Sequence, residues 1–141
     1  IDIMKYFLCI FLLFTLHSIS TSAQVKSSKT ESIDYNRVYE IVDVQPKFPG
    51  GLAAMMAFIQ DSIRYPEDAI DNGIEGTAIV QFIVERDGSI TDIQIVRDPG
   101  GGLGREAERI IKLMPKWEPG KQRDNPVRVK MSAPVRFRLS R

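Results

Sequence analysis

The spacing of apolar residues predicts three helices in this chain. Apolar positions recur three and four residues apart from Leu52 to Ile63, which is the spacing of one helix face. A short second helix is predicted over 66–73, because a proline suits its first turn, two acidic residues follow, and a glycine ends it. The helical spacing returns over 103–114 and stops at Pro115. We expect the methionines of the first helix to fill the core. The apolar positions of that helix are Leu52, Met55, Met56, Ile59 and Ile63.

Apolar residues on alternate positions predict three strands. The first covers 76–84, and the turn at Asp87-Gly88 is a strong hairpin signal, so a return strand should follow it and end near Arg97. The last run, 127–139, alternates strictly: its odd positions are apolar, and its even positions are cationic, polar or proline. Pro134 has no N–H for a ladder, so we expect this strand at a sheet edge.

These elements predict an α+β two-layer sandwich. The hairpin makes the first two strands antiparallel, and the helix between the second and third strands reverses the chain. A mainly antiparallel sheet then places the third strand beside the first. We therefore expect a three-stranded antiparallel sheet in the order 2-1-3, with two to three helices packed on one face and a right-handed crossover.

The N-terminal segment has the features of an export signal. A charged start precedes the apolar run 6–16, and small residues follow it, with Ala23 at the expected cleavage point. We interpret residues 1–23 as a signal peptide, and the alternative is that the segment is kept as an uncleaved membrane anchor. The polar stretch 24–38 should be a flexible linker, and 39–141 the folded domain.

Composition argues against several kinds of chemistry. The chain has one cysteine, Cys9, and one histidine, His17, and both lie in the predicted signal peptide. A mature domain without them lacks the usual Cys–His and Ser–His–Asp arrangements and His/Cys zinc sites. We therefore expect no enzyme activity, no metal and no cofactor. The formal net charge of +1 provides no global basic field for nucleic acid.

Positive charge is concentrated near the C-terminus. Between 112 and 141, lysines and arginines far outnumber the acidic residues, which are Glu118 and Asp124. This region is either a solvated strand face or a patch that attracts acidic segments of a partner, and the sequence leaves both interpretations open. A long edge strand also leaves N–H and C=O groups unpaired, which suits the docking of an extended peptide.

Several short motifs stand in a fixed order along the chain. They are Tyr65-Pro66, the strand 76–84 with Asp87-Gly88, Glu106-Ala107, Trp117-Glu118-Pro119-Gly120-Lys121, and a strand that ends Val135-Arg136-Phe137-Arg138-Leu139. This series closely resembles the C-terminal domain of TonB. The motif Phe48-Pro49-Gly50-Gly51 resembles the version of this energy transducer found in Bacteroidetes-type bacteria. The resemblance covers roughly residues 39 to 139.

The resemblance implies a periplasmic domain that supports energised import of siderophores, cobalamin or glycans. Such domains bind a short segment of outer-membrane TonB-dependent transporters, the TonB box, which pairs with their last strand. The family also contacts receptors around its Tyr-Pro motif. Carried onto this chain, the resemblance implies partner contacts from Val127, Arg128, Val129, Lys130, Met131, Ser132, Arg136 and Arg138 on the last strand, and from Gln60, Arg64, Tyr65 and Pro66 around the motif.

Four alternatives stay open at this point. Tyr65 is also explained as an amphipathic residue that seals a helix end. If residues 4–23 are kept as an anchor, the chain would be a full energy transducer with ExbB–ExbD as partners. The short apolar run and the missing Pro-rich spacer favour a non-energised peptide-binding adaptor instead. Self-association through the free edge would give a homodimer with no transporter role.

Overall fold

The computed structural model describes residues 32–140. The predicted signal peptide, 1–23, and the first part of the predicted linker therefore lie outside the described residues. A compact unit begins at Ile33, earlier than the domain start expected at residue 39, because Ile33 packs against the buried cluster around Val129. Within the described part of the chain, no helix is long and apolar enough to cross a membrane.

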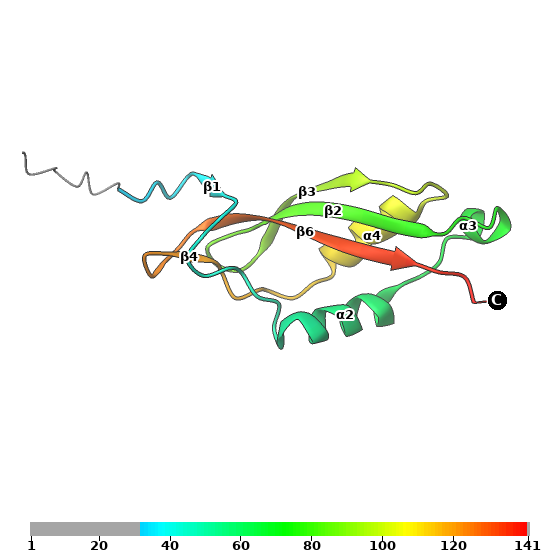
Figure 1. The fold of residues 1–141 in the computed structure, drawn as a ribbon, viewed down its shortest axis with the longest axis horizontal. Coiled ribbons are helices and arrows are strands. Elements are labelled where there is room, and N and C mark those ends of the chain that lie inside the picture. Colours follow the sequence, from blue (N-terminus) through cyan, green and yellow to red (C-terminus); the bar gives the residue numbers. More distant parts are fainter. Residues whose placement is uncertain (1–31, 141) are drawn as a thin grey trace, which may run out of the picture. The chain divides into compact units, whose positions relative to one another are not determined.

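Three helices and six strands make up the described part of the chain (Figure 1). All three predicted helices and all three predicted strands are present, with ends close to those expected. Three further strands, each two residues long, were not predicted. In chain order the elements are β1 (Val38–Tyr39), α2 (Gly51–Ser62), α3 (Glu67–Asp71), β2 (Gly76–Val84), β3 (Ile90–Arg97), α4 (Leu103–Lys112), β4 (Lys121–Gln122), β5 (Asn125–Pro126) and β6 (Arg128–Phe137).

The main sheet has four strands in the order β1-β6-β2-β3, so the prediction of a three-stranded antiparallel sheet in the order 2-1-3 is wrong. The three long strands do pair as expected, since β2 is antiparallel to both β3 and β6. β1 adds a fourth strand that runs parallel to β6, and this makes the sheet mixed. A two-residue strand carries no alternation from which its pairing could be predicted.

The core lies between the helices and one face of the sheet, which confirms the α+β class. The odd-numbered residues of β6 face this core and most of its even-numbered residues are exposed, so the alternation predicted for the last strand is confirmed. Helix α4 packs against β2 and β3, and α2 adds Met55 and Ile59 to the same core. The fully buried large side chains include Val80, Phe82, Val84, Leu103, Ile110, Ile111, Val135 and Phe137.

The segment between β1 and α2 is tied to the chain that leads into β4. Val44 and Lys47 form isolated antiparallel bridges with Lys121 and Glu118, with N···O distances of 2.8 to 3.0 Å. The bridges bring the turn before α2 next to Trp117, so that the rings of Phe48 and Trp117 meet edge-on with centroids 5.8 Å apart. This packing positions one wall of the site described next.

Candidate functional site

Strand β6 has a partner along nearly all of one side, but only at its start on the other. β2 pairs with 129–137, whereas β1 pairs with Arg128 and Val129 alone. No other described strand pairs with this second side. The expectation that all of 127–139 has an unpaired side is therefore wrong at its N-terminal end. We call the open side of residues 131–138 the free flank.

Pro134 indicates which backbone groups face the free flank. A proline cannot donate a hydrogen bond, and the pairing with β2 is continuous around it, so its nitrogen should face away from β2. Backbone groups alternate in direction along a strand, so the N–H groups of Ser132 and Arg136 should also face the free flank. Leu139 is out of phase with them, and it donates its N–H to Glu75, which directly precedes β2, at 2.6 Å.

Ion pairs hold the start of β6 in place. Arg128 donates from Nε to the Glu85 carboxylate at 2.9 Å and from Nη1 to the Asn36 carbonyl at 3.1 Å. The hydrogen bonds from Arg128 hold the pKa of Glu85 below its ordinary value, although partial burial acts in the opposite direction. Lys130 pairs with Glu40 at 3.2 Å. Of the predicted contact residues, these two cations are therefore already engaged within the fold, and Val127 and Val129 are buried.

A trough runs between the free flank and helix α2. It consists of three adjoining hollows, and residues of both elements line each of them. Their volumes, in order along β6, are about 440, 260 and 360 Å³. The first and second share Pro134, and the second and third share Gln60 and Arg136. The trough offers space beside an open strand edge, which strand addition requires.

Helix α2 presents apolar side chains near this trough. The sequence pattern placed Leu52 and Met56 on the core-facing side, and this is wrong, because they are 71% and 48% exposed. In α2 only Met55 and Ile59 are buried. Figure 1 shows the reason: α2 lies along the β6 edge of the sheet, so core surrounds it on one side only. No sequence signal separates Leu52 from Met55, since both fit the same helical spacing.

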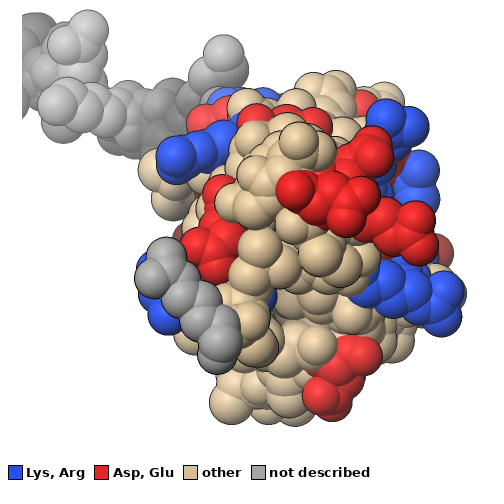
Figure 2. Space-filling model, turned by 90° about the vertical axis from the view of Figure 1, so that its right-hand side faces the viewer, with Lys and Arg blue, Asp and Glu red and all other residues tan. Residues whose placement is uncertain are grey.

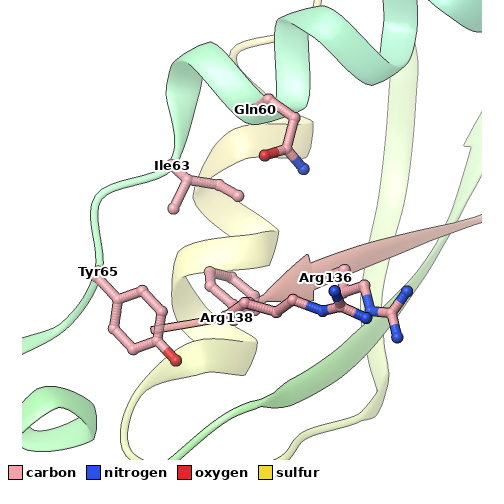
Figure 3. A pocket seen from close by; sticks show the side chains of 6 residues that line it. Gln60, Ile63, Tyr65, Arg136 and Arg138 are labelled. Atoms are coloured by element: carbon pink, nitrogen blue, oxygen red, sulfur yellow. The ribbon is translucent and has the colours of Figure 1, made fainter. Parts of the chain in front are cut away.

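The far end of the trough brings the two predicted contact surfaces together. Gln60 and Tyr65 line its hollow of about 360 Å³ together with Arg136 and Arg138. Figure 3 shows Gln60 and Ile63 on the helix side of this hollow and the two arginines on the strand side. Neither arginine has an ion-pair partner among residues 32–140. Two segments far apart in sequence thus form one surface.

Tyr65 is held firmly by the fold. Its ring packs edge-on against Phe137 with centroids 5.8 Å apart, and its hydroxyl donates to the Ile74 carbonyl at 2.6 Å. Burial raises the pKa of Tyr65, and the charge of Glu75 raises it further. These contacts support the interpretation of Tyr65 as a residue that seals the chain after α2, while the rest of its surface lines the hollow.

Arg64 and Pro66 do not line the trough but a further open hollow of about 670 Å³, which shares Tyr65 with the far end of the trough. Glu106 accepts hydrogen bonds there from the Arg64 backbone N–H at 2.7 Å and from Arg109 at 2.6 Å. Arg109 also donates to the Ser62 carbonyl at 2.7 Å. Burial alone would raise the pKa of Glu106, but the hydrogen bonds from Arg109 and Arg64 lower it overall. This cluster joins the end of α2 to α4.

Charge at this end of the domain is mixed. Figure 2 shows the end that carries α3 and the C-terminus, with acidic and basic side chains around a centre of uncharged residues. The two arginines of the free flank are therefore a local feature and not part of a field of one sign. Within 32–140, no group of three or more histidine, cysteine, aspartate or glutamate residues is placed to hold a metal ion.

Comparisons with known proteins point to one family. The family model for the Gram-negative bacterial TonB protein C-terminal matches residues 61–139. Among solved structures, an NMR solution structure of Helicobacter pylori TonB-CTD, residues 194–285, is 30% identical, covers 58% of this chain and 88% of that chain, and has a TM-score of 0.41. A second, of residues 179–285, is 29% identical, covers 65% and 89%, and has a TM-score of 0.40. No curated protein matches this chain.

Proposed function

The chain belongs to the family of Gram-negative bacterial TonB C-terminal domains, and from this premise we propose that it binds the TonB box of an outer-membrane TonB-dependent transporter by strand addition. Domains of this family are periplasmic, interact with such transporters, and are transducers, not enzymes. The observation that carries the proposal is the free flank of β6, which is open beyond its start and has a trough beside it.

The free flank is better suited to a guest strand than the opposite edge of the sheet. Its backbone groups would supply hydrogen bonds from Ser132 and Arg136, and the trough would take alternate side chains. The opposite edge, β3, has register shifts in its pairing with β2, and Asp92 has a φ of 48°. Such irregularities protect an edge from pairing with another chain.

The arginines of the free flank would favour acidic residues near the TonB box. Arg136 and Arg138 are exposed, so each ion pair would contribute only about 0.2–1 kcal/mol. We expect such pairs to change the association rate and its salt dependence more than the affinity. The interpretation of the C-terminal charge as an attractive patch therefore belongs to this proposal.

The wider role depends on the N-terminal segment. We propose a periplasmic location and a contribution to energised import of siderophores, cobalamin or glycans. Partnership with ExbB–ExbD requires that residues 4–23 stay as an inner-membrane anchor, and otherwise the domain is a non-energised adaptor. N-terminal sequencing of the periplasmic protein separates the two, because a chain that starts at Gln24 cannot be anchored.

A titration of the isotope-labelled full chain with a peptide that carries a TonB box tests strand addition. We expect the largest backbone amide shifts at residues 131–138, with smaller shifts at Gln60 and Tyr65. A peptide of the same composition in scrambled order is the control and should leave these amides unchanged. Shifts confined to β3 or to Arg64 and Pro66 would contradict the proposal.

A further inference from the structure

The hollow at the head of the trough is more apolar than pairing between backbones requires. It is the largest of the three, with a volume of about 440 Å³. The buried Phe48 and Trp117 line it together with the exposed Leu52, and Met131 and Ser132 line it from β6. Of its lining residues in the described chain, Lys47 alone is charged.

We propose that this hollow binds one large aliphatic or aromatic side chain of the strand that docks on the free flank. The inference rests on the proposed function and deepens it: the partner segment is an extended peptide with an apolar anchor residue. The anchor lies at the end of the peptide nearest β1. The two further hollows of the trough then take the side chains that follow on the same face.

Strand geometry directs such a side chain into the hollow. Residues opposite each other in paired strands point their side chains to the same face of the sheet. Met131 belongs to the core-facing positions of β6, is partly buried against the core, and lines the hollow. A guest residue opposite Met131 therefore points towards the helices, into the space between Trp117 and Leu52.

β1 shows how an extended segment sits on this side of β6. Tyr39 pairs with Val129, and Tyr39 and Met131 both pack against the small buried cluster of Val42, Val127 and Val129. Side chains two residues apart on a strand share a face, so a guest residue opposite Met131 takes the next place on the same face. The segment already seated there and the hollow are thus continuous along β6.

The exposed apolar surface beside the hollow supports the same occupant. Leu52 is 71% exposed although it is apolar, and an anchor side chain would cover it. Covering such a patch removes apolar surface from water, which is the main favourable term in peptide docking. The positive charge of Arg136 and Arg138 lies at the other end of the flank, so the head of the trough selects for apolar character and its far end for acidic character.

A double-mutant cycle tests the anchor. Each apolar residue of a TonB-box peptide is replaced in turn by alanine, and its dissociation constant from the full chain is measured. We expect one position to stand out with a loss of about tenfold, because removal of a large buried side chain changes affinity by at least this factor. With Leu52→Lys, the parent peptide and the peptide with alanine at that position should bind with equal affinity. Alanine at the other positions should have the same effect as it has with the unchanged chain. Lysine keeps helix propensity at this exposed site.

Leu113→Lys is the matched control, because Leu113 is also exposed, at 55%, but lies outside the three hollows. It should preserve the difference between the parent and alanine peptides. Trp117 is the only tryptophan of the chain, so a bromophenylalanine placed at the anchor position should quench its fluorescence, and one placed at the next position should quench less.

Three outcomes would overturn the inference. If the peptide binds on the free flank but alanine costs less than about threefold at every position, strand addition stands and the anchor is wrong. If the chain without peptide gains mass in solution as its concentration rises, and Leu52→Lys abolishes this gain, the hollow binds a second copy of this chain instead. If no TonB-box peptide binds at all, the proposed function itself fails, and the anchor fails with it.

Discussion

Single residues hold the loops that shape the trough. Gly88 has a φ of 84°, and a Cβ built there would lie 1.9 Å from the backbone oxygen of Trp117. The Trp117 N–H donates to the Gly88 carbonyl at 2.8 Å, so the hairpin turn directly supports the tryptophan that lines the apolar hollow. The sequence indicated the turn, but it could not reveal this contact, because the two backbones meet only in the folded chain.

Gly88→Ala should lower the free energy of unfolding by more than about 2 kcal/mol. The alanine would be strained in the left-handed conformation, and its Cβ would also collide with the backbone of Trp117. Gly73→Ala is the matched control, because Gly73 also has a positive φ but has nothing within 4 Å of the added Cβ. We expect it to cost about 1 kcal/mol. Urea unfolding of both variants measures the difference. Equal losses in the free energy of unfolding would contradict the prediction, because they would mean that the Trp117 backbone moves to make room for the added carbon.

Glu106→Gln should lower stability at neutral pH by about 1–3 kcal/mol, because the buried carboxylate accepts hydrogen bonds from Arg64 and Arg109. The pKa of Glu106 lies below its ordinary value of 4.5 in the folded chain. Its ionised form therefore stabilises the fold above pH 4.5, and this contribution is lost as the pH falls through the folded-state pKa. Urea unfolding at a series of pH values should show the gap between parent and variant narrowing in acid. A gap of constant size would contradict this role for Glu106.

At the scale of elements, periodicity predicted what is long and failed for what is short. The long strands carry enough repeats to fix their faces, and the core face of β6 followed directly, whereas the five-residue helix α3 was predicted from its proline, acidic residues and glycine. β1 has two residues and no period, so its parallel pairing with β6 could not be predicted. Helical spacing also could not show that α2 lies at the sheet edge, which leaves Leu52 beside the trough instead of in the core. The convergence of Gln60 and Tyr65 with Arg136 depends on that same placement.

Proline substitutions on β6 test which backbone groups face the free flank. Ser132→Pro should weaken binding of a TonB-box peptide by about fivefold or more, because it removes a donor to the guest strand. It should leave most of the fold's stability intact. Val135→Pro should instead lower the free energy of unfolding by more than about 2 kcal/mol, because its N–H should face β2. Calorimetry for binding and urea unfolding for stability decide this, and a reversal of the two effects would contradict the assignment.

At the scale of the whole molecule, one side of β6 is paired with β1 at its start and is not paired with any described strand along the free flank that follows. β1 occupies this side of β6 at Arg128 and Val129, and the next residue, Lys130, forms an ion pair with Glu40. The free flank that remains, 131–138, can pair with a guest of about eight residues, or roughly 26 Å of extended chain. The other edge of the sheet, β3, is irregular. Under the proposed function, the domain would therefore offer a partner strand one side, of limited length.

Disulfide trapping tests most directly whether a partner strand adds to the free flank. In a Cys9→Ser background, Ser132→Cys places the only thiol on the flank, and Gln94→Cys places it on β3 as the matched control; both positions are exposed. TonB-box peptides with a single cysteine at successive positions are then added under mild oxidation. Cα atoms of residues opposite each other in antiparallel strands lie about 4.5–5.5 Å apart, within the range that a disulfide spans. We predict rapid trapping at Ser132→Cys by cysteines on alternate peptide positions only, and slow trapping at Gln94→Cys. Equal trapping at both sites, or no dependence on peptide position, would contradict strand addition to β6.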